Sequence, residues 1–490
     1  MNPPVAAARD HRSREAWVVC ALVLAVFVVN LLTGTRFPAV WLDEVQYTDP
    51  AVNLYLGHGF TSTAWFVQTG EKFWAAYVPL HQFVLYGWMQ IFGFSPLAVR
   101  SLNYTLVTFA VLLLWHTARK QAWIPTARAR ILLVLLVLLD YGVSICTRSG
   151  RYDGVVMLLA AAATWASSFA RPRARLPAMA ALAAGFPFAG LQLTTFTAAF
   201  CVLLVVFTGW RRIRECLALA GGGLAGSIGL RLLYQHHGVW DDFLASIRYC
   251  MTVTVGNLPK DPSLIALFAV ALLLVGWRWR RGELRFNSPL VFGITGAVWI
   301  GLWFHLLGRF PTTYTWMAYV PLAIGVCATL PEAFRAAGLP FKITATTLLT
   351  LGCAAGLPLQ LASTFYYWPE RDYAKVEAFI ARHVHSDDSV YSDPEAYYTV
   401  KKTARHIVLP SYLAATPEEN ARLNVLVLRP YHAEKVMARL GGRWTRDGET
   451  LPGITRPFFF AKPDTDSKLT WDYNLEIWRK QPEAETHTAR

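Results

Sequence analysis

Two neighbouring carboxylates, Asp43 and Glu44, stand where the chain leaves its first long apolar run. That run, residues 17–34, has no charged residue and is long enough to cross a bilayer. Acids at this place neither anchor a span nor favour lipid, and they are suited to take a proton from a molecule at the membrane surface. The alternative is a solvated loop, or the first turn of a surface helix, where the helix dipole favours acids. Asp43 is therefore the candidate general base, and Glu44 the candidate for orienting it or the substrate.

The composition is that of a membrane protein. Of 490 residues, 54% are hydrophobic and 16% charged, and the mean hydropathy is +0.33. Nineteen tryptophans and twenty tyrosines fit a protein with many bilayer interfaces. The net charge of +14 comes from short basic clusters between apolar runs, which is the positive-inside pattern. No single basic stripe marks a nucleic-acid surface, and no nucleic-acid partner is expected.

Metal and cofactor motifs are missing from the sequence. The seven cysteines are scattered without CxxC spacing, so neither a zinc site nor a disulfide framework is indicated. No dinucleotide, Walker, HExxH or GxSxG motif stands in a plausible context. We expect no cofactor and no metal ligands, although the sequence does not exclude a divalent metal.

The apolar runs predict eleven membrane spans. Arg9, Arg12 and Arg14 precede the first run, and no cleavage site follows it, which indicates an uncleaved anchor with a cytoplasmic N-terminus. If Val78–Phe94 also crossed, the later basic clusters would face outward, so we interpret this segment as an interfacial helix. The C-terminus then lies outside. The predicted spans are 17–34, 98–117, 129–147, 154–170, 176–192, 194–210, 216–234, 263–277, 289–306, 315–330 and 343–363.

The chain divides into two domains by character. Residues 1–363 form the transmembrane domain, with a first outer loop at 35–97, and residues 364–490 form an extracytoplasmic α/β domain. Periodicity in the second part predicts helices at Tyr373–His383 and His432–Leu440 and strands at Asp388–Tyr391 and Asn424–Leu428. At roughly 100 ordered residues it is large enough for its own core. Residues 481–490 resemble a frayed tail.

With this orientation, acids and arginines gather at the outer face. Arginines there are able to hold a phosphate while a carboxylate activates a nucleophile. The alternative for Arg148, Arg151 and Asp153 is a local salt bridge that caps a helix. Arg309 is the first choice as phosphate ligand and Arg100 the second, because the alternative for Arg100 is a pair with an acid that closes the first loop onto the second span. His58, His81 and His305 are more typical of packing or interface positions than of ligation, and Asp140 is expected to pair with Arg148 or Arg151. The candidate phosphate or substrate ligands are Arg100, Arg148, Arg151, Asp153, Arg309 and Tyr314, with Asp140 and His81 in support.

The order of three segments resembles the membrane-embedded GT-C glycosyltransferases. The segments are Trp41-Leu-Asp-Glu44, Asp49 to Phe60, and Val78 to Arg100, and later positions around Arg151-Tyr-Asp153 and Arg309 to Pro321 fit the same pattern. Within residues 15–330 the sequence is most similar to the protein-mannosyltransferase, aminoarabinose-transferase and Rgt-like branch. The resemblance implies that Asp43 is the catalytic base and that the sugar comes from a polyprenyl-phosphate carrier. Asp-Glu in place of Asp-x-Asp leans towards the metal-independent branch, and the second Pro or Lys common near Pro79 is missing.

These observations predict a bacterial inner-membrane enzyme with a periplasmic or extracellular C-terminal domain. It would transfer a sugar, with inversion, to a hydroxyl of a lipid, glycan or protein acceptor at the outer face, among membrane lipids. One alternative is a transporter or flippase of lipid-linked saccharides, whose path Asp140 and the arginines would line. A membrane-anchored scaffold is the other. A phosphate leaving group needs little protonation, so one base is sufficient.

Overall fold

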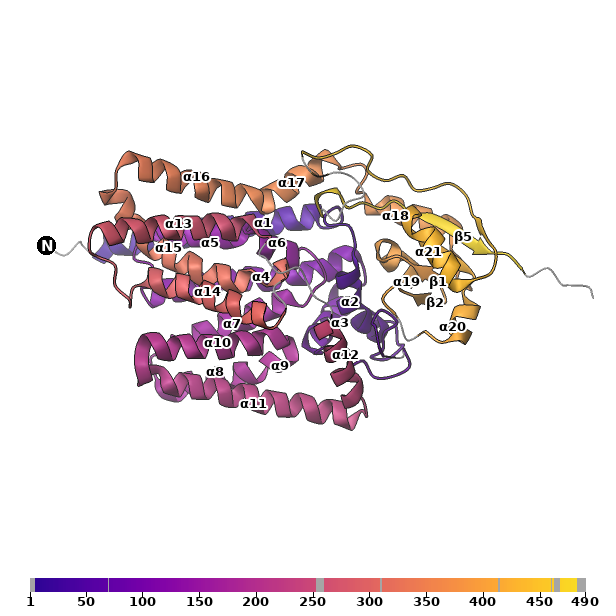
Figure 1. The fold of residues 1–490 in the computed structure, drawn as a ribbon, viewed down its shortest axis with the longest axis horizontal. Helices are drawn as coiled ribbons and strands as arrows, with labels where there is room; N and C mark the ends of the chain where they lie inside the picture. Colours follow the sequence, from indigo (N-terminus) through magenta and orange to yellow (C-terminus); the bar gives the residue numbers. More distant parts are fainter. Residues whose placement is uncertain are drawn as a thin grey trace, which may run out of the picture.

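Long apolar helices lie side by side in one bundle, and a small sheet lies at one end of it (Figure 1). A computed structural model describes residues 5–68, 70–252, 260–308, 311–412, 415–459, 461 and 468–482. The helices of the bundle and its connections are α1 (Val5–Thr33), α2 (Leu42–Tyr55), α3 (Leu80–Phe92), α4 (Pro96–Lys120), α5 (Ala127–Leu139), α6 (Tyr141–Thr147), α7 (Asp153–Ala166), α8 (Pro172–Ala184), α9 (Phe186–Ala189), α10 (Leu191–Thr208), η1 (Gly209–Arg212), α11 (Ile213–His236), α12 (Trp240–Thr252), α13 (Pro262–Arg280), α14 (Pro289–Leu306), η2 (Thr312–Tyr314), α15 (Trp316–Ala336), α16 (Leu339–Ala355) and α17 (Leu357–Tyr366).

The chain is a polytopic membrane protein. Among the described residues, six helical stretches are long and apolar enough to cross a membrane, or eight if each of two bent helix pairs is one span. One stretch, 191–236, contains both α10 and α11, which contact each other. Each predicted run overlaps one helix or two or three consecutive helices. The number eleven nevertheless stays a prediction.

The two bent pairs break at places that pack together. Helices α5 and α6 meet at 51°, and α16 and α17 at 47°. The side chain of Asp140 accepts a hydrogen bond from Val143 N at 2.7 Å and so begins α6 as its N-cap. A Cβ on Gly356, at the second break, would stand 1.8 Å from the carbonyl oxygen of Leu139. Only glycine fits this close approach, which fixes where the bundle joins the segment leading to the sheet.

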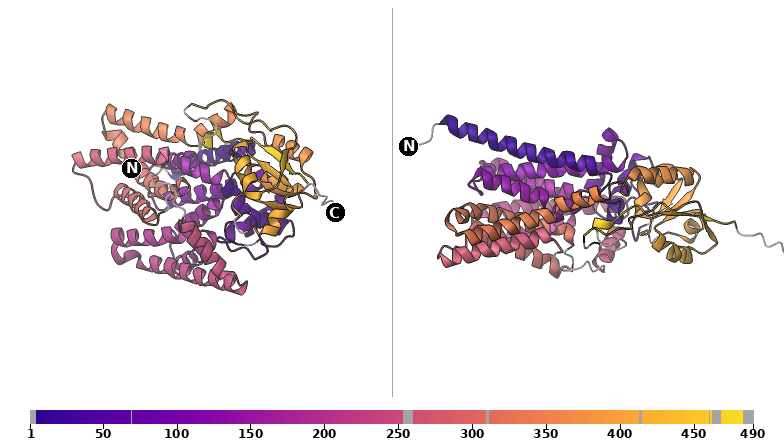
Figure 2. Two further views of the ribbon diagram at one scale, coloured as in Figure 1. Left: turned by 45° about the vertical axis from the view of Figure 1, so that its right-hand side comes forward. Right: turned by 90° about the horizontal axis from the view of Figure 1, so that it is seen from above.

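The basic connections lie at the end of the bundle away from the sheet. Figure 1 shows the α10–α11, α13–α14 and α15–α16 connections at that end. These connections carry the arginines and lysines of 211–214, 278–285 and 335–342. Helix α1 begins at the same end and finishes beside the sheet domain (Figure 2). This arrangement agrees with the positive-inside pattern.

Helices α2 and α3 lie between the bundle and the sheet (Figure 1). Helix α3 has 13 residues, about 20 Å, which is too short to cross a bilayer. It buries Leu85 and Met89 and exposes Ile91 and Phe92 by 74% and 57%. The amphipathic pattern behind the interfacial interpretation of 78–94 is therefore present.

The C-terminal part is a mixed sheet flanked by helices. Its order is β2-β1-β3-β5-β4, parallel across β2-β1-β3 and antiparallel at β5 and β4. The predicted helices and strands are present with shifts of at most two residues, whereas β2, β4 and β5 were not predicted. The elements are α18 (Tyr373–His383), β1 (Ser389–Ser392), η3 (Pro394–Ala396), α19 (Tyr397–Thr403), β2 (His406–Val408), α20 (Pro417–Arg422), β3 (Val425–Leu428), α21 (Pro430–Leu440), β4 (Trp444–Arg446), η4 (Lys468–Thr470) and β5 (Glu476–Lys480). The predicted frayed tail falls mostly outside the described residues, since only 481 and 482 of it are described.

The C-terminal part has a core of its own on one face of the sheet, where Val408, Leu426 and Ala433 belong to one buried cluster, and it also shares a second core with the bundle. The other face of the sheet and helices α18 and α19 share a single apolar core with α2, α3 and the start of α4. Val45 and Val52 of α2 belong to the same buried cluster as Val390, Val425 and Ile477 of the sheet. The first outer loop is thus a structural layer that joins the bundle to the sheet.

Candidate active site

Asp43 and Glu44 occupy the first turn of α2 and face opposite environments. Successive residues of an α-helix point about 100° apart. The side chain of Asp43 is 40% exposed, whereas that of Glu44 is completely buried. Only Asp43 is open to solvent, so the two acids stand in different environments.

The guanidinium of Arg151 lies between two carboxylates. Its Nη1 donates to Asp43 Oδ2, and its Nε donates to Asp153 Oδ2 at 2.8 Å. The rings of Trp41 and Tyr47 stand over it at 5.6 and 5.4 Å. Burial acts to lower the pKa of Arg151, but the two carboxylates outweigh it and raise that pKa well above its ordinary value. Arg151 is therefore a fixed cation beside Asp43. The predicted local salt bridge is present for Arg151 and Asp153, and it extends to α2.

The loop before α7 is held by its backbone carbonyls. Asn103 of α4 donates to the carbonyl oxygens of Ser149, at 2.6 Å, and of Arg151. His81 Nε2 donates to Gly150 O at 3.0 Å. A Cβ on Gly150 would stand 2.5 Å from the side chain of Val99, so a larger residue would push the loop out.

His81 is a buried residue that holds the loop before α7. Its side chain is 1% exposed, and burial lowers its pKa to about 4. It is neutral at pH 7 and acts as a hydrogen-bond donor. His58 and His305 are exposed, and no bonded partner of either side chain is found within the described residues. His81 is thus a packing residue, whereas an interface position for His58 and His305 stays a prediction.

Arg100 is not available to a phosphate. Its Nε and Nη2 donate to the two oxygens of Glu44 at 2.8 and 2.6 Å, and its Nη1 donates to the carbonyls of Gly34 and Pro38 at 2.6 and 2.8 Å. Both side chains are fully buried. This geometry contradicts Arg100 as a phosphate ligand and Glu44 as a group that touches the substrate. The pair joins α4 to α2.

Arg148 differs from the other buried arginines. Its Nη2 donates to Thr33 Oγ1 at 2.6 Å and to Phe37 O at 3.3 Å, and its guanidinium lies over the Phe37 ring at 5.4 Å. Within the described residues its Nε and Nη1 have no hydrogen bond of good geometry, although the Tyr104 hydroxyl interacts with the guanidinium, and no carboxylate pairs with it. The side chain is 1% exposed, and burial lowers its pKa to about 10. A bound anion would supply the negative charge and the hydrogen-bond acceptors that the fold does not provide to this guanidinium.

Asp140 does not pair with Arg148 or Arg151 as expected. Besides capping α6, it lies close to Asp261, the N-cap of α13. The point where a Cβ on Gly142 would stand is 3.2 Å from Asp140 Oδ2 and 2.8 Å from Asp261 Oδ2. Thr315 donates to Asp261 at 2.6 Å. The expectation was wrong because the break between α5 and α6 turns Asp140 towards α13.

Two predicted substrate ligands, Tyr314 and Arg309, remain, and the structure describes only the first. Tyr314 lies beside the site, and its hydroxyl is 3.1 Å from that of Tyr152. Arg309 lies outside the described residues. Among the described residues no group of three or more His, Cys, Asp or Glu is arranged to hold a metal ion.

Sequence reasoning missed an aromatic group beneath Asp43. Tyr47 packs on Tyr152 and Tyr77 with ring centroids 4.5 and 5.6 Å apart. Asn103, an amide in the middle of an apolar run, was also missed. The sequence held a sign of its importance, because a polar side chain inside an apolar run is costly to bury unless it forms hydrogen bonds.

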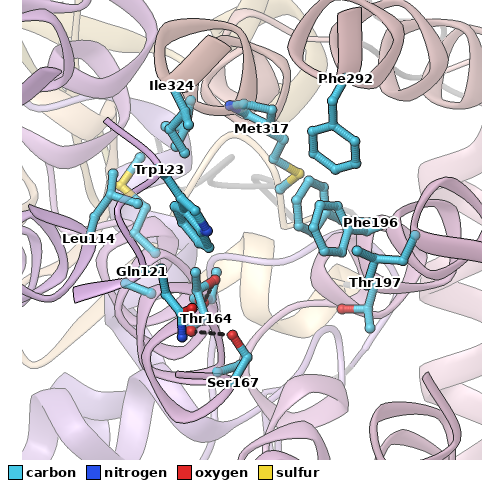
Figure 3. Close-up of a pocket in the computed structure, with 18 of the residues that line it drawn as sticks. Leu114, Gln121, Trp123, Thr164, Ser167, Phe196, Thr197, Phe292, Met317 and Ile324 are labelled. Atoms are coloured by element: carbon cyan, nitrogen blue, oxygen red, sulfur yellow. Dashed lines mark hydrogen bonds between the residues drawn. The ribbon is translucent and has the colours of Figure 1, made fainter. Parts of the chain in front are cut away.

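A large apolar cavity lies in the bundle below this aromatic group. Its volume is about 490 Å³, within the range of small-molecule sites. Figure 3 shows Trp123 and Leu114 lining it on one side and Phe196 and Phe292 on the other, with Met317 between them. Leu193 lines its upper part, and the adjacent Gln192 accepts a hydrogen bond from Tyr77 at 2.7 Å. The cavity therefore ends next to the aromatic group of the Asp43 site.

Solved structures show the same fold. ArnT from Cupriavidus metallidurans bound to undecaprenyl phosphate aligns with a TM-score of 0.60 and 13% identity, over 96% of this chain and 98% of that chain. Its apo state aligns at 0.57 and 14%, over 95% and 98%. No family model and no curated protein matches the sequence. The likeness confirms the resemblance at the level of fold, which is that of the GT-C glycosyltransferases.

Proposed function

We propose that this chain, with the fold of the GT-C glycosyltransferases, transfers a sugar from a polyprenyl-phosphate donor to an acceptor hydroxyl, with Asp43 as general base. The observation that carries the proposal is one partly exposed carboxylate, held by a buried arginine, in a bundle that also contains an apolar cavity lined by Leu193, next to the Gln192 that bonds Tyr77. A donor with a lipid tail and a sugar phosphate needs both features within one molecule. ArnT of the same fold is described bound to undecaprenyl phosphate.

The proposed reaction is an in-line displacement at the anomeric carbon. Asp43 takes the proton of the acceptor hydroxyl, and the acceptor oxygen forms the new bond to the anomeric carbon. The bond from that carbon to the phosphate oxygen breaks, and polyprenyl phosphate leaves with the electron pair. Because phosphate leaves as an anion, one base is enough, unlike the carboxylate pair of a glycosidase. Configuration at the anomeric carbon inverts.

Arg148 is the proposed ligand of the donor phosphate. Its unpartnered guanidinium nitrogens suit two phosphate oxygens, as the planar fork of arginine allows. The side chain is nearly inaccessible, so the donor has to displace the segment around Phe37 to reach it. Arg151 is less suited, because its charge is already shared between Asp43 and Asp153.

A transfer assay in detergent tests the function against the transporter alternative. Purified protein, a panel of polyprenyl-phosphate sugars and hydroxyl-bearing acceptors should give a product whose sugar is bonded to the acceptor. A flippase makes no product in detergent, where no leaflets exist. Movement of labelled donor across liposomes without any transfer would favour the transporter instead.

The orientation is also part of the proposal. We place the N-terminus in the cytoplasm and the C-terminal domain outside, in a bacterial inner membrane. Cysteines introduced at the exposed positions Gly57 and Glu418 should react with an impermeant thiol reagent in spheroplasts, whereas one at Ala174 should not. The opposite labelling would put the Asp43 site on the cytoplasmic side.

A further inference from the structure

Helix α2, which carries Asp43, lacks strong local support. Its N-cap residue Trp41 makes no side-chain capping bond, and Pro50 lies inside it. Proline removes a backbone hydrogen bond, and a helix of 14 residues is marginal on its own. Contacts from outside the helix therefore decide where Asp43 stands.

One such contact comes from the C-terminal domain. Tyr398 of α19 donates its hydroxyl to Glu44 Oε1 at 2.9 Å, and the same oxygen accepts from Arg100 Nε at 2.8 Å. All three side chains are fully buried. Glu44 is thus held from one side by α4 and from the other by α19, and Asp43 is the next residue along the chain.

A second contact joins the same two helices one to two turns further on. Tyr397 donates to Asp49 Oδ1 at 2.7 Å, and Lys401 Nζ pairs with the same oxygen at 3.0 Å. The other oxygen of Asp49 accepts from Ser62 Oγ at 2.7 Å and from Thr63 N at 3.1 Å. Two attachments five residues apart fix both the rotation of α2 and its position along its axis.

Apolar packing accompanies these polar contacts. The Tyr398 ring lies 5.6 Å from that of Phe94, and Lys402 lies over Phe94 at 5.4 Å. Val45 and Val52 of α2 and Tyr397 share one buried cluster. The polar bonds are therefore shielded from water. In this buried environment a hydrogen bond is electrostatically stronger than in water.

We propose that Tyr397, Tyr398 and Lys401 are positioning residues for Asp43, and that the C-terminal domain completes the active site through α19. The inference rests on the proposed function, because it assigns these residues to the base of that reaction. Loss of an attachment lets α2 turn or slide and moves Asp43 away from Arg151. A misplacement of about 1 Å costs on the order of 100-fold in rate.

The test compares two buried tyrosines of the same domain. Tyr398→Phe removes the hydroxyl that holds α2, whereas Tyr391→Phe removes one that bonds Arg439 at 2.8 Å and does not touch α2. We expect Tyr398→Phe to lower kcat roughly 10- to 100-fold while the donor KM changes less than about twofold. Tyr391→Phe should leave both at the wild-type level. Tyr397→Phe is the milder variant, since Lys401 still pairs with Asp49, and it serves if Tyr398→Phe does not fold.

Hydrogen exchange of the α2 amides, read by mass spectrometry, separates this inference from the proposed function. Exchange within 42–55 should be faster in Tyr398→Phe and unchanged in Tyr391→Phe. It needs no substrate, so faster exchange in a protein inactive with every donor would support the attachment and count against the transferase. Wild-type kcat and wild-type exchange in both Tyr398→Phe and Tyr397→Phe would overturn the inference.

Discussion

Replacing Asp43 or Glu44 with its amide should have different consequences, a loss of activity in the first case and a loss of stability in the second. Asp43→Asn keeps the shape of the side chain and removes its basicity. Loss of a general base costs on the order of 100-fold or more in kcat, which is about 2.7 kcal/mol of transition-state stabilisation. The fold should tolerate the change, because Asp43 is 40% exposed and Arg151 keeps Asp153 as its partner at 2.8 Å. We expect a stability loss of about 1 kcal/mol or less.

Glu44→Gln should act on the fold first. Both oxygens of Glu44 are bound by Arg100, and neither side chain has any exposure to water. The amide leaves the guanidinium buried without a carboxylate, which costs about 3–5 kcal/mol. That is a large part of the roughly 5–15 kcal/mol that keeps a domain folded. The variant should show a low yield and a strongly lowered thermal unfolding midpoint in detergent.

The two variants are measured together, by thermal unfolding and by transfer from a polyprenyl-phosphate sugar. Asp372→Asn is the matched control for Asp43, because Asp372 is a partly exposed acid that pairs with Arg36 at 3.0 Å. It should keep its activity. Transfer by Asp43→Asn within about threefold of wild type would refute the role of this base. A stable but inactive Glu44→Gln protein would show that Glu44 takes part in the chemistry directly.

Three further outcomes are expected. Arg148→Lys should raise the donor KM about 10-fold, because lysine cannot hold two phosphate oxygens; donor kinetics check this, and an unchanged KM excludes Arg148 from the phosphate site. Met317→Trp fills the cavity and should lower the affinity for the donor, as a binding titration would show, while the thermal midpoint changes by no more than a few degrees. Burial raises the pKa of Glu395 from 4.5 to about 7, and the hydrogen bond with Asp393 raises that of His432 above 6.5. Each group binds more protons in the folded state than in the unfolded state, so its contribution to stability is lost as pH rises. The loss falls between about pH 4.5 and 7 for Glu395, and between pH 6.5 and the folded pKa for His432. A plot of thermal midpoint against pH should therefore have a smaller slope for Glu395→Gln than for the wild type.

Much of the fold was predictable because lipid imposes one composition on every segment that crosses it. The runs that became α4, α11, α13 and α14 were identified within a few residues from hydropathy alone. Strands β2 and β5 were not, because β2 has three residues and β5 carries Glu476, Arg479 and Lys480. Short or charged strands owe their place to their neighbours in the sheet and leave little periodicity in the sequence.

The site was predictable in its residue types and not in its pairings. Asp43 and Arg151 were singled out as outer-face groups, and the structure brings them together across 108 residues. The sequence suggested an acid as an alternative partner for Arg100, and the structure has Glu44 there, but the sequence gives no measure of which acid an arginine meets and did not set Arg148 apart. Tyr398 was passed over because its partner, Glu44, lies 354 positions away.

The partners of the buried arginines indicate which of them is suited to bind a ligand. Buried arginines are kept in a fold when carboxylates or several carbonyl groups satisfy them, since an unpaired buried charge is costly. Arg100 has Glu44, and Arg371 donates to the oxygens of Leu469, Trp471 and Ser363 at 2.6–3.1 Å. Arg148 donates through Nη2 to Thr33 and Phe37 and has the Tyr104 hydroxyl beside it, but no carboxylate pairs with it within the described residues. The fold thus satisfies Arg100 and Arg371 by itself and gives Arg148 no carboxylate, which is why Arg148 is the proposed ligand of the donor phosphate.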